Sequence, residues 1–420
     1  MTQSICIFED PGYNQLLPLV YMRPTYELRC GMTTLRQKLV RCYPGVPVTL
    51  RSRSYLSDLV RQQNPGIPVN SVPASSCLFL NGRVIADESF AAQIPLHGED
   101  TVYVQGDTLV AARVSGSALD RLRPGLPDAP SAADFDGIKQ QNVNVRTINY
   151  PWDLVNANGG EITADFHMLT AGIPRKIAGH VHEGVYLVNP DAIFIEEGAT
   201  VKPGVVLDAE QGPIYIAKNA LIFPHVTIEG PASVGEGSRV KAGAKIYECT
   251  SIGPVCKVGG EVESSIVHGF ANKQHDGFLG HSYLSMWVNL GADTNNSDLK
   301  NNYGHVRVTI NGEAVDSGSV FAGLFMGDHS KSAINTMFNT GTVVGISSNV
   351  FGAGFPPKSI PSFAWGGAEE MSVYDLERSL DVARRVMGRR NTVMSEVEEK
   401  VFRKVFELTQ QERWRAGMQQ

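Results

Sequence analysis

The sequence has little of several things, and each shortage excludes a class of protein. Only six of its 420 residues are cysteines, and none forms a Cys-x-x-Cys pair, so no disulfide framework is indicated. Charged residues make up 19% of the chain and the formal net charge is −6, so the composition does not indicate a basic surface that would bind nucleic acid. No apolar run reaches the roughly 18 residues of a membrane helix, and the first residues do not resemble a signal peptide. We expect a cytoplasmic protein that binds neither nucleic acid nor membrane.

A chain of this length is too long for one ordinary core and should divide into smaller units. Residues 1–115 read as a mixed α/β domain. Helices are expected at Arg36–Cys42 and Leu56–Gln62, and strands at Ser4–Phe8, Val46–Leu50, Cys77–Leu80 and Thr101–Val104. Residues 116–184 read as a connector with a short helix near Ala164–Thr170, because proline and glycine interrupt any period up to about residue 150.

A period of six residues dominates the chain from about residue 185. The aliphatic positions that share it are Ile195, Val201, Leu207, Ile216, Ile222, Ile228, Val234, Val240, Ile246, Ile252 and Val258. Three extra residues between Leu207 and Ile216 fit a small loop. A weaker series follows at Ile334, Thr340, Ile346 and Gly352.

A period of six matches neither the 3.6 of a helix nor the alternation of a strand. It predicts a left-handed parallel β-helix over residues 185–362, in which three hexads close one triangular turn and each turn stacks its aliphatic residues on the last. Ordinary sandwich strands would be separated by turns every 8–12 residues and would not hold one phase for eight repeats. Helical spacing then predicts a helical tail over residues 363–420, covering the C-terminal end of the coil.

Polar residues concentrate between the two hexad series, from Asn272 to Gly304. Histidine titrates near neutrality, so His275 is suited to take a proton from an attacking amine. Asparagine side chains and backbone N–H groups can orient a substrate and stabilise the oxyanion of a thioester. A lone histidine could equally satisfy a corner of the coil.

This segment resembles the acetyltransferase domain of the bifunctional glucosamine-1-phosphate N-acetyltransferase / N-acetylglucosamine-1-phosphate uridylyltransferase family. That family carries His-Leu-Thr-Tyr-Leu-Gly, then Val-Asn-Ile-Gly-Ala-Gly-Thr and Cys-Asn-Tyr. The counterparts here are His275-Asp-Gly-Phe-Leu-Gly280, Val288-Asn-Leu-Gly-Ala-Asp-Thr294 and Asn302-Tyr303.

The resemblance implies an acyltransferase of UDP-N-acetylglucosamine and cell-wall synthesis. Its co-substrate would be acetyl-CoA, its acceptor an amino-sugar 1-phosphate such as glucosamine 1-phosphate, and its assembly a homotrimer. His275 would be the catalytic base, Asn289 and Asn302–Tyr303 would bind the sugar phosphate, and Ala292 would lie near the thioester.

Two departures from the family pattern leave the acceptor open. Phe278 stands in place of a family tyrosine, and Glu263 stands near the position of a family lysine that contacts the sugar phosphate. The basic residues that could supply the missing charge are Lys245, Lys273, Lys300 and Arg307.

Asn14-Gln-Leu-Leu-Pro-Leu19 and Arg23-Pro24 occupy the place of segments found in sugar nucleotidyltransferases. The whole chain is similar to a divergent bacterial group that joins a short sugar-nucleotidyltransferase-like domain to such a coil. Active nucleotidyltransferases open with a glycine-rich loop, whereas Phe8–Tyr13 contains one glycine. Arg83 replaces the aspartate that would bind Mg²⁺, so the metal is needed only if this domain is active. Arg23 and Arg83 remain possible phosphate ligands for UTP or a UDP-sugar.

Two further alternatives stay open from the sequence. The chain could be a sugar-nucleotide-binding regulatory protein with a degenerate transferase site and a coil that only trimerises. A zinc site of His268, His275 and His281 is not predicted, because His275 belongs to the transferase motif. A metal site at His180–Glu183 is not predicted either, because this group lacks a third ligand at a suitable spacing.

Overall fold

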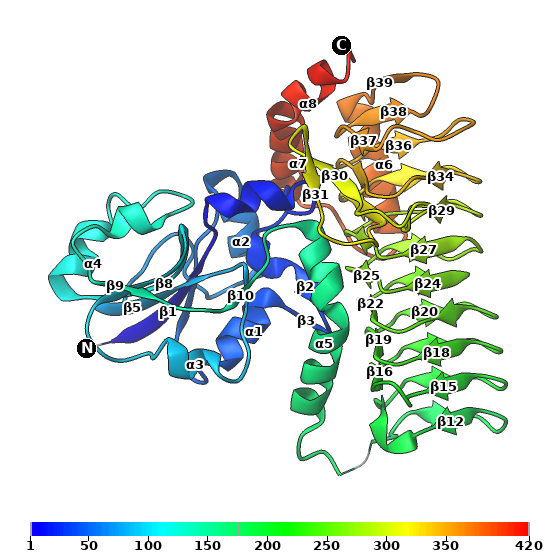
Figure 1. The fold of residues 1–420 in the computed structure, drawn as a ribbon, viewed down its shortest axis with the longest axis horizontal. Coiled ribbons are helices and arrows are strands. Elements are labelled where there is room, and N and C mark those ends of the chain that lie inside the picture. Colours follow the sequence, from blue (N-terminus) through cyan, green and yellow to red (C-terminus); the bar gives the residue numbers. More distant parts are fainter. Residues whose placement is uncertain (1, 175, 419–420) are drawn as a thin grey trace.

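The computed structural model describes residues 2–174 and 176–418. An α/β domain lies beside a long coil, and helix α5 (Pro151–Thr170) runs between them (Figure 1). Within the described residues, no helix is both long and apolar enough to cross a bilayer.

The α/β domain is built on a six-stranded sheet of order β4-β1-β5-β8-β7-β9. The four predicted strands are present as β1 (Gln3–Phe8), β4 (Val48–Leu50), β5 (Ser76–Asn81) and β7 (Thr101–Gln105). β8 (Thr108–Ser115) is an additional strand, antiparallel to β5 and β7. Its middle residues are buried, so it lacks the in–out alternation that marks a half-exposed strand.

The predicted helices of this domain are α1 (Leu35–Arg41) and α2 (Ser57–Gln63). Thr34 and Gln37 form a capping box that starts α1. The segment expected as a connector is structured: β9 (Gln140–Asn142) pairs with β7, and β10 (Arg146–Thr147) pairs with β6 (Val84–Ile85). The short helix expected near Ala164 is the last part of the 20-residue α5.

The coil has three faces, each a parallel sheet that takes one strand from every turn. The first face contains β11 (His180–Val181), β14 (Thr200–Val201), β17 (Leu221–Ile222), β20 (Arg239–Val240), β23 (Lys257–Val258) and β26 (Asn272–Lys273). The second face contains β12 (Tyr186–Val188), β15 (Val206–Asp208), β18 (Thr227–Glu229), β21 (Lys245–Ile246), β24 (Glu261–Glu263) and β27 (Phe278–Gly280).

The third face is the longest unbroken sheet of the three. It contains β13 (Ile193–Ile195), β16 (Ile214–Ile216), β19 (Ala232–Val234), β22 (Thr250–Ile252), β25 (Ile266–Val267), β28 (Tyr283–Leu284), β32 (Leu324–Met326), β35 (Thr342–Val344) and β37 (Ser359–Ile360). Helix α5 and the α/β domain pack against this face. The second face lies on the side away from that domain (Figure 1).

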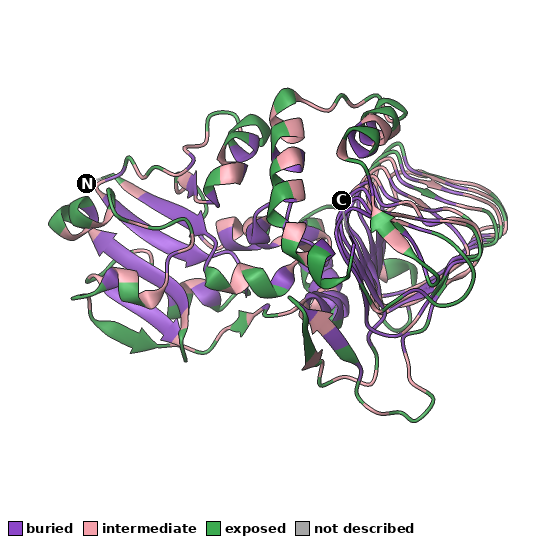
Figure 2. Ribbon diagram, turned by 90° about the horizontal axis from the view of Figure 1, so that it is seen from above, coloured by how far each residue is buried: buried purple, intermediate pink, exposed green. Residues whose placement is uncertain are grey.

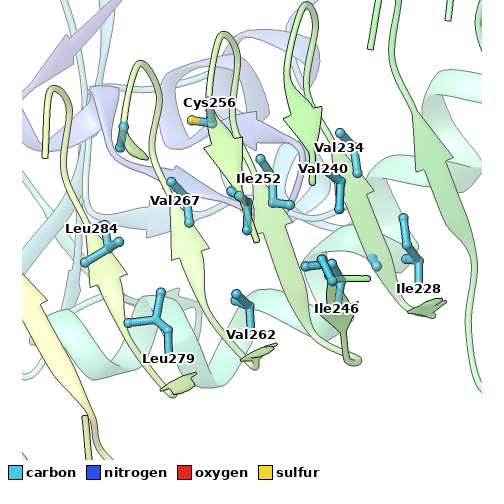
Figure 3. Packing of buried hydrophobic residues seen from close by; sticks show 14 of the residues in the cluster. Ile228, Val234, Val240, Ile246, Ile252, Cys256, Val262, Val267, Leu279 and Leu284 are labelled. Carbon is cyan, nitrogen blue, oxygen red and sulfur yellow. The ribbon is translucent and has the colours of Figure 1, made fainter. Parts of the chain in front are cut away.

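The aliphatic residues of the hexads stack in register inside the coil. Ile222 pairs with Val240, and Ile228 pairs with Ile246 on the next face. These side chains point into one continuous core, as Figure 3 shows for residues that include Ile228, Val240 and Ile246. The left-handed parallel β-helix predicted from the period of six is confirmed.

The phase of the second hexad series was predicted wrongly. Ile334 is 68% exposed, and the inward positions are Ser332, Phe338, Val344 and Val350. Ile346 of the predicted series is buried, but outside the coil's core, in a cluster with residues of the α/β domain and the tail. The period of six itself is correct and continues across the insertion over residues 299–321, because Asn296 before it is in register with Phe338 after it. This insertion carries the hairpin of β30 (Arg307–Ile310) and β31 (Glu313–Asp316).

The tail consists of α6 (Leu376–Gly388), α7 (Glu396–Leu408) and α8 (Gln410–Arg415). Phe402 of α7 meets Phe363 of the coil edge-on at 5.2 Å, and Met418 is buried in the coil's own core. α7 also contacts α2 of the α/β domain. The tail therefore covers the end of the coil and joins it to the other domain, and Figure 2 shows buried residues running across this junction.

Candidate functional site

The carboxyl ends of β1, β4 and β5 form the edge where a nucleotide would bind in a parallel sheet of this kind. Arginines occupy this edge. Arg53 donates to both carboxylate oxygens of Glu9, at 3.1 and 3.0 Å, and neither side chain is exposed by more than 6%. Arg23 forms a bidentate pair with Asp328 of the coil, which ties the two domains together.

The guanidinium of Arg83 is held by four hydrogen bonds. Its guanidinium bonds both oxygens of Asp10, at 2.6 and 2.5 Å, and also the Ile148 carbonyl and the Asn149 side chain. A Cβ on Gly12 would overlap this guanidinium, so Arg83 fills the space inside the Phe8–Tyr13 loop. Mg²⁺ needs carboxylate oxygens, and Asp10 is already paired with a cation. These residues do not fit a bound metal, and neither Arg23 nor Arg83 presents a free guanidinium to a phosphate.

The first corner, between the first and second faces, carries the predicted base. His275 is exposed there, in the sixth turn of the coil (β26 to β28). The backbone N–H of Asp293 donates to the carbonyl of Asp276 at 3.1 Å, which stacks the corner of the seventh turn on that of the sixth. Ala292 therefore lies one turn above His275. The structure brings together the predicted base and the residue predicted to lie near a thioester.

Lys273 supports this corner from inside. Its side chain is at an inward position, 2% exposed, and its Nζ donates to the His275 carbonyl at 2.6 Å. Burial lowers the pKa of Lys273 to about 8, while Asp276 and Asp293 act in the opposite direction. Lys273 therefore does not reach the surface as the substrate ligand that was predicted.

Asn289 lies on the first face, in register with Asn272 below it. Asn272 donates to the Asn289 side chain at 3.2 Å and accepts from Arg390, which follows α6, at 2.5 Å. Sequence reasoning did not single out Asn272 or Arg390. Their hydrogen bonds connect the tail to Asn289 of the predicted site.

A cluster of cations lies on the first face below Asn272. Arg239 and Lys257 are in register on neighbouring strands, and Lys257 is in register with Asn272. Burial lowers the pKa of Lys257, and Arg390, Arg239, Arg389 and Lys241 lower it further. In a chain of net charge −6, this concentration of cations marks a surface suited to an anion.

The other predicted residues lie at the second corner, between the second and third faces. Asn302 and Tyr303 are exposed in the insertion that leaves the seventh turn here, and the side chain of Tyr303 is 72% exposed. Lys300 precedes them and is close enough to Lys358 to lower the pKa of Lys358, although burial is the larger cause. Lys245 instead forms an ion pair with Glu261 at 3.2 Å, and Arg307 donates to the Ala314 carbonyl within the hairpin.

The second corner also holds a histidine–carboxylate pair that the sequence reading did not assign. His281 and Asp298 lie on consecutive turns, with Nδ1 and Oδ2 2.8 Å apart and side chains 16% and 13% exposed. The ring of Phe321 stacks on the imidazole at 4.6 Å. The other two histidines of the zinc group considered from the sequence lie elsewhere. His268 bonds to Tyr283 at 2.8 Å under the α/β domain, and His275 is at the first corner.

Comparisons with known proteins match parts of this chain. Residues 5–173 match the family model described as sugar nucleotidyl transferase. The chain is 24% identical over 190 residues to bifunctional protein GlmU of Rippkaea orientalis, with 40% of this chain and 42% of that protein covered. For GlmU of Desulfitobacterium hafniense the identity is 30% over 141 residues, covering 29% and 31%. The chain spans about two-fifths of the length of the curated relatives it matches.

Among solved structures, a crystal structure of UDP-N-acetylglucosamine acyltransferase aligns with 51% of this chain and 81% of its own, at 13% identity and a TM-score of 0.26. The enzyme of that name from Campylobacter jejuni aligns with 55% and 95%, at 13% identity and a TM-score of 0.20. Scores this low leave both likenesses without weight for function.

Proposed function

We propose, from the premise that this chain is a divergent GlmU-like protein, that its coil transfers an acetyl group from acetyl-CoA to the amine of an amino-sugar 1-phosphate. The stacking of His275 and Ala292 at one corner of successive turns is the observation that carries this proposal. It sets an imidazole beside a small residue, which leaves room for a thioester at this corner. We call this corner the donor half of the site, with His275 as its proton-transfer group.

The cations on the first face support the choice of CoA as the donor. Arg239, Lys257, Asn272 and Asn289 follow one another in register, and neighbouring strands are about 4.8 Å apart. The row therefore rises by roughly 14 Å from the cations to Asn289. The phosphates of CoA would lie on the cations and on Arg389 and Arg390, and the pantetheine arm would follow the row to Ala292.

The acceptor half of the site is proposed at the second corner. Asn302 and Tyr303 are there, and Lys300 with Lys358 supplies positive charge for the sugar phosphate. Lys245 and Lys273 are less suitable for this purpose, since one is paired with Glu261 and the other is bonded inside the coil. Lys300 also donates to a carbonyl, that of His305, but it precedes Asn302 and Tyr303 directly and replaces Lys245 and Lys273 as the proposed phosphate ligand.

The two halves lie at opposite edges of the second face. His275 and His281 are six residues apart with β27 between them, which is up to about 20 Å of extended chain. A thioester at one corner and an amine at the other can react only if two coils meet edge to edge. We therefore propose a homotrimer in which the donor half of one subunit faces the acceptor half of the next.

The α/β domain is proposed to have no nucleotidyl transfer activity of its own. The arginine–carboxylate pairs at its strand ends, Arg83–Asp10 above all, use the groups that would hold Mg²⁺ and a triphosphate. Its proposed role is structural, through the Arg23–Asp328 pair and the packing of α2 on α7.

The test is release of free CoA thiol from acetyl-CoA by the purified full-length protein. We expect turnover with glucosamine 1-phosphate and none with glucose 1-phosphate, which lacks the amine. Binding of UDP-N-acetylglucosamine without any thiol release would favour the sugar-nucleotide-binding regulatory protein instead.

A further inference from the structure

We propose that a cleft between α1, α3 (Phe90–Gln93) and α5 binds a sugar phosphate, with Arg41 and Arg146 holding the phosphate. The cleft opens on the side of the α/β domain where α1 lies beside α5 (Figure 1). It is separate from the strand ends that hold Arg83 and from both corners of the coil. The inference does not depend on the acyl transfer, and it gives the α/β domain a ligand to bind in addition to its structural role.

Five charged side chains of alternating sign form a row under this cleft. The row reads Arg41, Asp165, Lys38, Glu161 and Arg146, joined by N–O distances of 2.6, 2.8, 2.8 and 2.7 Å. The side chains of its three middle members are at most 2% exposed. Buried charges are tolerated only when they are paired, yet this row has three cations and two carboxylates. One positive charge is left over, and an anion in the cleft would neutralise it.

The two arginines at the ends of the row present donors to the cleft. Nη1 of Arg41 donates to Asp165 and Nη2 of Arg146 donates to Glu161, and both arginines line the cleft. A guanidinium has five N–H donors, and within residues 2–174 and 176–418 no other acceptor is bonded to either group. The remaining donors suit the oxygens of a phosphate. Because each guanidinium is already held by a buried carboxylate, ordering it around a ligand costs little.

The opposite wall of the cleft is acidic. Asp87 and Glu88 follow β6 and are exposed, and Asp87 accepts from the backbone N–H and the hydroxyl of Ser89 at 2.9 and 2.7 Å. In the part of the chain that the structure describes, neither acid forms an ion pair with Arg41 or Arg146. Carboxylates repel an anion but accept hydrogen bonds from hydroxyl groups. The ligand that fits both walls therefore has a phosphate at one end and hydroxyl groups at the other.

The size and the lining of the cleft agree with a sugar between these ends. Its volume is about 760 Å³, within the roughly 300–1,000 Å³ typical of small-molecule sites. Ala91, Ala164 and Met168 also line it, and Met168 is 40% exposed. The C–H groups of a sugar ring can cover such an apolar surface. Inorganic phosphate alone would leave most of this space unfilled.

The experiment follows the cleft directly in the full-length protein. The methionine methyl groups are labelled with ¹³C, and the signal of Met168 is identified by its loss in Met168→Leu. Glucose 1-phosphate, inorganic phosphate and glucose are titrated separately. We expect glucose 1-phosphate to shift the Met168 signal with a dissociation constant on the order of 1 mM or below. Inorganic phosphate should bind more weakly, and glucose should cause no saturable shift.

Three substitutions in the cleft test the assigned contacts. Arg41→Met and Arg146→Met should each weaken binding about 10-fold or more, because each removes hydrogen bonds from a charged donor. Ala164→Trp should also abolish binding, since it fills the cleft from an exposed position of α5 and leaves both arginines in place. Arg36→Met is the matched control, because Arg36 is also on α1, is 23% exposed and pairs with Glu27, but lies outside the cleft. It should leave binding unchanged.

Several results would overturn the proposal. One is the absence of a saturable Met168 shift with glucose 1-phosphate. Another is unchanged binding in Arg146→Met and Ala164→Trp, two exposed positions whose variants test the cleft even if Arg41→Met fails to fold. Loss of the shift in Lys300→Met would show that it is transmitted from the coil. Inorganic phosphate that binds as tightly as glucose 1-phosphate would remove the sugar from the proposed ligand.

Discussion

The ammonium of Lys273 donates to the backbone carbonyl of His275 at 2.6 Å from inside the coil. A lysine at this inward position interrupts a ladder of aliphatic residues, with Val258 in register on one side of it. The carbonyl at an open corner would otherwise depend on water. Lys273 therefore shapes the corner that presents His275, although it does not itself face a substrate.

Replacing this lysine should change how stability depends on pH. Burial lowers the pKa of Lys273 to about 8 in the folded protein, against 10.5 for an unperturbed lysine. Between these values the unfolded chain binds more protons than the folded one, so this group makes stability rise with pH. Lys273→Met should remove that rise, on the order of 1–3 kcal/mol between pH 7 and 10.

The measurement is urea unfolding of the wild type and of Lys273→Met at several pH values across that range. The result is the difference between their free energies of unfolding at each pH. The difference matters because buried tyrosines and cysteines with raised pKa values, such as Cys256 at about 12, contribute with the opposite sign. Lys331→Met is a matched comparison, since the pKa of Lys331 is also lowered to about 8 by burial. Parallel curves for the wild type and Lys273→Met would show that the lysine is not buried as described.

Removing the cations of the first face should weaken binding of the acyl donor. In Arg389→Ala/Arg390→Ala we expect the KM for acetyl-CoA to rise about 10-fold, because the two lost phosphate contacts together cost on the order of 1.4 kcal/mol. The KM for the acceptor should not change. Arg385→Ala on α6 is the control, since Arg385 pairs with Asp381 and is exposed. If Arg385→Ala raised the KM for acetyl-CoA as much as the double variant does, this would argue against a phosphate site here.

The α/β domain should not form a UDP-sugar. With Asp10 held by Arg83, we expect no pyrophosphate from UTP and N-acetylglucosamine 1-phosphate at millimolar Mg²⁺. Turnover near 1 s⁻¹ would falsify this reading. Arg83→Ala alone should destabilise the fold by about 3–5 kcal/mol, because it leaves a buried carboxylate unpaired. Replacing Arg83 and Asp10 together by apolar residues should cost less.

The mass in solution should be near three times 45.6 kDa. The reason is the separation of the donor and acceptor corners by the width of the second face, so that one coil cannot complete the site. Sedimentation at several concentrations provides the check, with thiol release followed on the same samples. Activity per chain that stays constant while the oligomer dissociates into monomers would contradict an interfacial site.

The sequence by itself determined the coil. A period of six carried by residues such as Ile222, Ile228 and Val240 needs no partner to be recognised, because each hexad repeats the same local choice of inward aliphatic and flexible corner. The roles of His275 and Ala292 were predicted from the family resemblance, and only the structure shows that they lie on one corner of successive turns. The inward positions after residue 299 could not be predicted, since Ile334 and Ile346 are apolar, yet the first is exposed and the second packs outside the coil's core.

The pairings across turns and between domains were decided only by the tertiary structure. His281 and Asp298 are 17 residues apart and meet because one turn stacks on the next, while Arg23 and Asp328 are 305 residues apart. Arg83 looked like a phosphate ligand until the fold set it against Asp10. The sequence specifies the charge and size of each side chain. Whether that side chain is free or paired depends on which distant groups the packing brings within hydrogen-bond distance.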